Sequence, residues 1–228
     1  MSSYNNESPV NPLPPVVLAL AAVIFAIEML FQLGARGIIG GPEAVGWRLA
    51  AVTRYGFIGD VFDQMLARNI WPVEHLLRLV SYPFIHASFT HAVFVLVFLL
   101  ALGKMVGEIF GAWAVLAVFF GSAIAGALVY GLLLDEPYPL IGGFPAVYGL
   151  IGAFTFLLWT KLALSGGPQS RAFVLIGFLM GIQLVFGLLF GGNRDWVADL
   201  AGFVAGFGLS FVVSPGGWGR VVDRLRRR

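Results

Sequence analysis

The chain has 228 residues, of which 59% are hydrophobic and only 11% are charged. Typical soluble domains carry about 25% charged residues, so this composition excludes a water-soluble globular protein and predicts several membrane-spanning helices. The sequence contains no cysteine, which excludes disulfides, thiolate nucleophiles and cysteine metal sites. The net charge of +2 says little as a total, because the placement of basic residues is what orients a membrane protein. We therefore expect an all-α polytopic membrane protein.

The chain starts with a polar, proline-rich stretch, residues 1–15, which we interpret as a short retained tail. It has neither the basic region nor the small-residue cleavage site of a signal peptide. The first predicted span is 16–33. A connector follows at 34–83, where eight charged residues from Arg36 to Glu74 alternate with apolar and aromatic ones. This pattern predicts short amphipathic helices that lie in the membrane interface.

Five further apolar stretches approach the roughly 20 residues that a bilayer crossing needs. They are 84–103 (continuing to 110), 112–134, 145–164, 172–189 and 196–213. A polar break at 191–195 separates the last two. The sequence therefore predicts a six-helix membrane domain over 16–213, followed by a basic tail over 214–228.

An even number of spans places both termini on one side of the membrane. The basic residues that share this side are Lys104, Lys161, Arg171, Arg220, Arg224 and Arg226–Arg228. Basic residues accumulate on the cytoplasmic side, so we expect both termini in the cytoplasm. The arginine tail is either a topology signal alone or also a contact for anionic lipids. The lack of cysteine, the compact form and the absence of a eukaryotic targeting signal favour a bacterial inner membrane.

The run Gly142-Gly143-Phe144-Pro145-Ala146-Val147-Tyr148-Gly149 opens the span at 145–164. It resembles the Gly-x-Ser-Gly-Ala-Val-Tyr-Gly signature of the rhomboid intramembrane serine proteases. Phe144 stands where that family keeps its serine, and Pro145 where it keeps the next glycine. A phenyl ring cannot attack a carbonyl, so this position favours binding over catalysis.

The resemblance covers about 76–206 and includes several positions that would shape the scaffold. Leu77-Arg78 resembles the family's Trp-Arg element, without the tryptophan. Glu108-Ile109-Phe110-Gly111 is similar to the Glu-x-x-Gly at the end of the second helix. Gly202 ends a run, 198–202, that is similar to the Ala-His-x-x-Gly of the sixth helix. The resemblance therefore implies a six-helix rhomboid-like bundle with an interfacial first connector and a lateral opening.

Other matching positions would line the former active-site cavity. His86 and His91 belong to a stretch, 83–91, that resembles the family's entry into its second helix. Val95 replaces the asparagine that follows the oxyanion histidine by four residues. Tyr148 matches the tyrosine beneath the catalytic histidine, and Asp199 replaces that histidine, the general base. With nucleophile, base and one oxyanion donor replaced, the pattern resembles the inactive pseudoprotease branch of the family.

The remaining ionisable residues leave alternatives open. Asp199 either pairs with His91 in the former cavity or caps the N-terminal end of its helix. Glu28 either contacts a partner or lipid, or pairs inside its own bundle. Glu108 either pairs with Lys104 one turn away or ties its helix to the connector. We expect no metal site and no cofactor, because His86 and His91 lie five residues apart and do not share a helical face.

These observations predict a non-catalytic rhomboid-like protein that binds transmembrane segments of client or partner proteins, for quality control, trafficking or assembly. A permanent accessory subunit of a larger bacterial membrane complex is the alternative. An active intramembrane serine protease with an unrecognised nucleophile, or a transporter, is a third reading. We expect membrane proteins and lipids as partners, and no nucleic acid.

Overall fold

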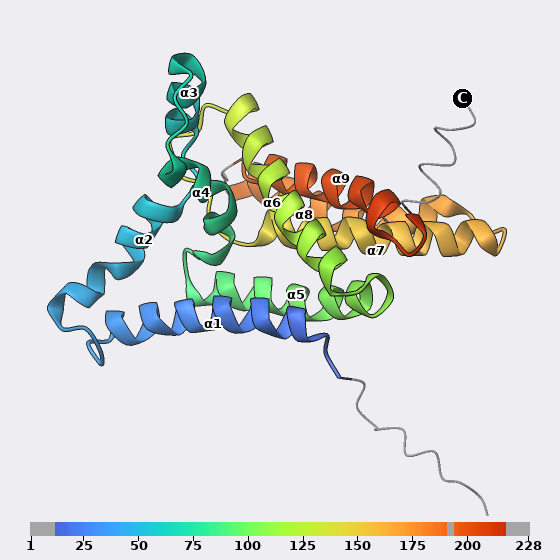
Figure 1. Ribbon diagram of the computed structural model, residues 1–228, viewed down its shortest axis with the longest axis horizontal. Coiled ribbons are helices and arrows are strands. Elements are labelled where there is room, and N and C mark those ends of the chain that lie inside the picture. The colour runs from blue at the N-terminus through green and yellow to red at the C-terminus, as the bar shows by residue number, and fades with distance from the viewer. Residues whose placement is uncertain (1–11, 191–193, 218–228) are drawn as a thin grey trace, which may run out of the picture.

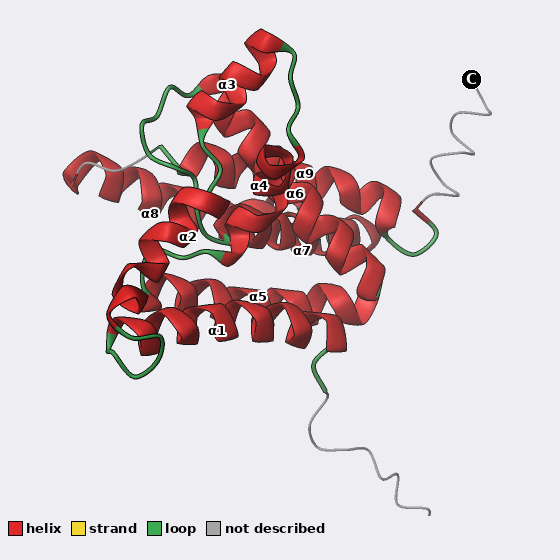
Figure 2. Cartoon of the chain, turned by 60° about the vertical axis from the view of Figure 1, so that its left-hand side comes forward, coloured by secondary structure: helices red, strands yellow, loops and turns green. Residues whose placement is uncertain are grey.

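The computed structural model describes residues 12–190 and 194–217 and is helical almost throughout (Figure 2). Among these residues there is no β-strand, only one isolated bridge between Phe57 and Leu140. The predicted all-α class is confirmed. Most of the predicted N-terminal tail (1–11), the start of the predicted break (191–193) and most of the basic tail (218–228) lie outside the described residues.

Five of the described helices are long and apolar enough to cross a membrane. They are α1 (Pro15–Ala35), α5 (Phe89–Phe110), α6 (Ala112–Leu133), α7 (Phe144–Leu164) and α9 (Trp196–Val213). They match five of the six predicted spans closely. The remaining span, predicted over 172–189, forms a 3₁₀ turn, η3 (Gln169–Phe173), and the 17-residue helix α8 (Val174–Phe190). That helix is apolar but shorter than an ordinary span.

The first connector folds into short helices, as its mixed pattern predicts. They are η1 (Pro42–Gly46), α2 (Trp47–Tyr55), α3 (Gly59–Arg68), α4 (Val73–Ser81) and η2 (Tyr82–Phe84). Figure 1 shows α2, α3 and α4 gathered along one end of the bundle. Arg78 of α4 donates hydrogen bonds to the backbone carbonyls of Thr53 (2.9 Å) and Gly56 (2.8 Å). This side chain therefore holds α4 against the end of α2.

Helices α7 and α9 pack closely side by side (Figure 1). Glycines permit this approach, because a Cβ atom on Gly206 would overlap the backbone of Gly149. A Cβ on Gly202 would likewise overlap the carbonyl group of Pro145. Small residues at such contacts let membrane helices approach through their backbones. The packing fixes the start of α7, where the motif residues lie, against the start of α9.

The turn between α5 and α6 consists of Gly111, whose φ of 85° is a conformation that favours glycine. One turn earlier, Lys104 and Glu108 form an ion pair at 3.9 Å, as the spacing of four predicts. In Figure 1, α1 begins and α9 ends at the same end of the bundle. This end lies opposite the short connector helices.

Candidate functional site

The residues of the glycine-rich motif lie at the start of α7, facing the entry into α5. Phe144 is the first residue of α7, and its ring stacks on the imidazole of His91 with the ring centres 5.1 Å apart and the planes at 17°. The rings of Phe144 and Tyr148 meet in a T-shaped arrangement, with their centres 6.5 Å apart. The phenyl ring therefore contacts two residues that the sequence places in the former cavity.

His86 lies in the loop before α5 and contacts this stack. Its side chain is 1% exposed and meets the ring of His91 edge-on, with the ring centres 5.0 Å apart. Burial, and secondly the charge that His91 would carry, lower the pKa of His86 to about 3. The imidazole is therefore neutral at physiological pH, and its Nε2 accepts a hydrogen bond from the backbone N–H of Gly143 at 3.3 Å. His86 thus holds the loop that leads into α7.

Three polar side chains form a chain of hydrogen bonds across α7, α8 and α9. The hydroxyl of Tyr148 donates to Oε1 of Gln183 at 3.1 Å, and Nε2 of Gln183 donates to Oδ2 of Asp199 at 2.8 Å. The carboxyl group of Asp199 is deeply buried, since the residue is only 2% exposed. Gln183 therefore satisfies a polar group that would otherwise be costly inside the bundle, and it joins α8 to its two neighbours.

The first of the two roles considered for Asp199, a pair with His91, is wrong, because the side chain of Asp199 bonds to Gln183 and that of His91 stacks on Phe144. Nε2 of His91 is buried without a hydrogen-bond partner among the described residues. The second role considered for Asp199, an acidic group at the positive N-terminal end of its helix, agrees with its position in the first turn of α9. The N-cap residue itself is Asp195, and no side-chain cap bond forms there.

Gln183 is the site residue that the sequence analysis missed. It is the one strongly polar side chain within the apolar sequence of α8. A polar residue inside a membrane helix commonly faces the bundle and finds a partner there, so its isolation was a usable signal. The partner, however, lies on another helix and could be identified only from the fold.

A buried ion pair links the connector to α1 and to the site. Glu28 is 1% exposed and accepts hydrogen bonds from Nη2 and Nη1 of Arg48 at 2.6 and 2.9 Å, and from Gln32 at 2.9 Å. Nη1 of Arg48 also donates to the backbone carbonyl of His86 at 2.5 Å. Glu28 therefore pairs inside its own bundle, as one of the two interpretations predicts. Arg48 is a positioning residue that the sequence analysis noted only for its charge.

The remaining motif positions are apolar or act through the backbone. Val95 is fully buried, and a Cβ on Gly143 would meet its Cγ1 at 2.7 Å, so the valine packs directly beneath the loop. Pro145 lies in the first turn of α7, where its missing N–H leaves no hydrogen bond unmade. Within the described ranges, no three histidine, aspartate or glutamate side chains gather as a metal site requires.

Residues 73–216 match the rhomboid domain, and this region is more than half of the chain. The chain therefore belongs to the rhomboid family, and it is an integral membrane protein. This confirms the resemblance inferred from the motifs, which begins and ends close to these bounds.

Over 208 residues this chain is 30% identical to the Bacillus subtilis (strain 168) protein named "Putative rhomboid protease YdcA", and the matched region covers 88% of each of the two chains. This chain is also 32% identical over 138 residues to "Rhomboid-like protease 3" of Toxoplasma gondii, and that match covers 59% of this chain and 50% of the relative. It is 28% identical over 137 residues to "RHOMBOID-like protein 5" of Arabidopsis thaliana, covering 60% and 43%. The chain thus spans about half or less of the latter two relatives.

Proposed function

We propose that this protein is a non-catalytic member of the rhomboid family that binds transmembrane segments of other membrane proteins. The observation that carries the proposal is the stack between Phe144 and His91, at the position where the family motif has its serine. A ring at this place fills the space in which a hydroxyl and a substrate carbonyl would meet. It offers neither a nucleophile nor a hydrogen-bond donor.

The position of the general base supports the same proposal. Acyl transfer needs a base within hydrogen-bond reach of a nucleophile. Asp199 is instead bonded to the amide of Gln183, which is bonded in turn to the Tyr148 hydroxyl. A tyrosine hydroxyl held by an amide has no activating base beside it. The hydrogen bonds between Tyr148, Gln183 and Asp199 therefore connect α7, α8 and α9 and satisfy a buried carboxyl group.

Other hydroxyl groups near the site are engaged in structure. Ser88 caps α5 by accepting a hydrogen bond from the backbone N–H of His91 at 3.2 Å. Ser122 is fully buried in α6, and a Cβ on Gly149 would overlap its side chain. Its hydroxyl thus lies within tight helix packing, where no peptide bond could reach it. These positions make an alternative serine nucleophile a poor candidate.

The binding part of the proposal rests on α8. This helix packs mainly through η3 and α9, and it exposes large apolar side chains, among them Phe178 (64%), Val185 (53%) and Leu188 (87%). Gln183 is the polar link between this helix and the bundle. A helix held so lightly can be displaced sideways more readily than α7 or α9. A partner's transmembrane helix could then pack between α8 and the rest of the bundle or along its outer face.

Photocrosslinking in native membranes tests this function. A photoreactive residue at Val185 should give discrete adducts whose crosslinked peptides map to transmembrane segments of other proteins. The same residue at Leu133, which is 70% exposed on α6, serves as the matched control and should give only diffuse lipid adducts. Equal adducts from both sites would refute binding at α8.

A second measurement tests the loss of catalysis. A fluorophosphonate probe reacts with activated serines, so it should leave the protein unlabelled while labelling an active rhomboid protease in a parallel membrane sample. Labelling of any serine in this chain would overturn the non-catalytic part of the proposal. Recovery of one partner at a fixed ratio in mild detergent, through every purification step, would favour the permanent accessory subunit over transient client binding.

A further inference from the structure

One carboxamide satisfies both polar groups that α7 and α9 present to α8. Oε1 of Gln183 accepts from the Tyr148 hydroxyl at 3.1 Å, and Nε2 of the same side chain donates to Oδ2 of Asp199 at 2.8 Å. Tyr148 and Asp199 are 4% and 2% exposed, so a donor and an acceptor lie together inside the bundle. A carboxamide carries an acceptor and a donor side by side and therefore matches this pair.

The helix that supplies the carboxamide is otherwise an ordinary short membrane segment. Apart from Gln183, α8 (Val174–Phe190) consists of apolar residues and glycine. A Cβ atom on Gly177 or Gly181 would meet no described atom within 4 Å, so these glycines do not lock α8 against the bundle. Gly202 and Gly206, in contrast, hold α9 in backbone contact with α7. The donor and acceptor are thus rigidly placed, whereas the helix that fills them is lightly attached.

The carboxyl group of Asp199 has capacity for further donors. A carboxylate offers about four lone-pair sites. In the part of the chain that the structure describes, Gln183 is the one side chain hydrogen-bonded to it, through a single N–H. A buried carboxyl group with so few donors is costly. Another helix that brings an N–H group to this place can therefore compete with α8 for it.

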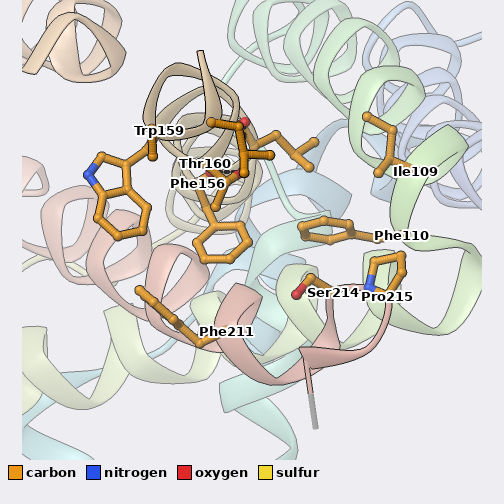
Figure 3. Close-up of a pocket in the computed structure, with 11 residues that line it drawn as sticks. Ile109, Phe110, Phe156, Trp159, Thr160, Phe211, Ser214 and Pro215 are labelled. Carbon is orange, nitrogen blue, oxygen red and sulfur yellow. Dashed lines mark hydrogen bonds between the residues drawn. The ribbon is translucent and has the colours of Figure 1, made fainter. Parts of the chain in front are cut away.

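The hollow at the other end of α7 is walled mainly by hydrocarbon. It has a volume of about 570 Å³, and the rings of Phe156, Trp159 and Phe211 stand around it (Figure 3). The hydroxyl of Thr160 donates to carbonyls of its own helix, at Phe156 (3.0 Å) and Leu157 (2.9 Å). Lipid tails are as apolar as leucine, so such walls do not select one membrane segment from another. Selection by hydrogen bonding is instead possible at Tyr148 and Asp199.

We propose that α8 occupies the position of a client, and that the clients selected here are transmembrane helices with an asparagine or glutamine near the middle of an apolar sequence. The carboxamide of such a helix takes the place of Gln183 between the Tyr148 hydroxyl and the Asp199 carboxyl group. Hydrogen bonds of this kind stabilise pairs of membrane helices. Gln183 is then an internal competitor that keeps the site filled until a client arrives. The inference rests on the proposed function, because it names the class of segment that the protein binds.

Photocrosslinking of synthetic helices to the full chain in phosphatidylcholine proteoliposomes tests the inference. The peptides are apolar, about 20 residues long, and carry a photoreactive leucine and either glutamine or leucine at the centre. The glutamine peptide should bind about threefold more tightly, as one interhelical hydrogen bond predicts. A peptide with its glutamine near one end should bind like the leucine peptide. Equal binding of the central-glutamine and leucine peptides would overturn the inference and leave the proposed function standing, whereas binding of neither would refute both.

Gln183→Leu removes the internal competitor and should raise the preference for the glutamine peptide over the leucine peptide by about a further fivefold. Misfolding cannot produce such a gain. Ile182→Leu, at the neighbouring position of α8, is the matched control and should leave the preference unchanged. Adding Asp199→Leu to Gln183→Leu should abolish the preference. An unchanged preference in Gln183→Leu, or one that survives the loss of Asp199, would overturn the inference.

Discussion

Replacing Arg48 by methionine should destabilise the protein strongly. The change removes two hydrogen bonds to Glu28 and one to the His86 carbonyl, and leaves a carboxyl group that is only 1% exposed. Removing one partner of a buried ion pair costs about 3 to 5 kcal/mol. The Arg48 side chain is 23% exposed, which places the expected loss near the lower end, at about 3 kcal/mol. Because the carboxyl group causes the loss, removing it as well should restore stability.

The free energy of unfolding in mixed micelles of dodecylmaltoside and SDS measures these effects. The double variant Glu28→Leu with Arg48→Met should regain most of the lost stability, because no charge is then buried alone. Arg54→Met is the matched control: Arg54 is exposed on the same helix, and its loss should change the free energy by less than about 0.5 kcal/mol. A loss below about 1 kcal/mol for Arg48→Met, or a double variant no better than the single one, would refute the reasoning.

Three further predictions concern the bundle and the site. Gly206→Ala should destabilise the bundle by about 1 to 3 kcal/mol through backbone overlap, whereas Gly208→Ala, where a Cβ meets nothing within 4 Å, should be neutral or slightly stabilising in the same assay. Gln183→Leu should leave Asp199 without its donor, cost about 1 to 3 kcal/mol and speed hydrogen exchange in α8; unchanged exchange would contradict the link. The folded-state pKa of His86 is about 3, below the ordinary value of 6.5. Between these two pH values the imidazole is protonated in the unfolded chain and neutral in the folded protein. Stability should therefore fall by about 1.4 kcal/mol per pH unit from 6.5 towards 3, and His86→Gln should flatten this slope.

Hydropathy and turn residues were sufficient to predict most of the fold. The predicted spans match five long helices closely, because length and apolar composition determine a membrane helix. The span at 172–189 was less regular, since a 3₁₀ turn occupies its first residues and shortens the helix that follows. The apolar stretch does not reveal such a change, because Ala172 and Phe173, which end the 3₁₀ turn, are as apolar as the helix that follows. The short connector helices were predicted as a class, without their bounds.

The site was predictable in its members and not in its contacts. The motif placed Phe144, His86, His91, Tyr148 and Asp199 in one region, and four of these five touch at least one other member. Asp199 is joined to Tyr148 only through an amide on another helix. A contact between residues far apart in sequence depends on how helices are rotated against each other. No single-sequence pattern supplies that rotation.

Phe144 and Asp199, which differ from the rhomboid motif, each contact a partner side chain within the bundle. A lone carboxyl group at the depth of Asp199 would cost several kcal/mol, so Gln183 is as necessary to the site as the aspartate itself. In the same way, the Phe144 ring packs against the flat face of His91. Loss of the imidazole would leave a void beside the phenyl ring. Introducing the family's motif residue at one position alone, such as Asp199→His, should therefore leave Gln183 without its carboxylate acceptor and lower stability without creating activity. If the proposed loss of catalysis is right, a gain of protease activity would require both contacts to change at once.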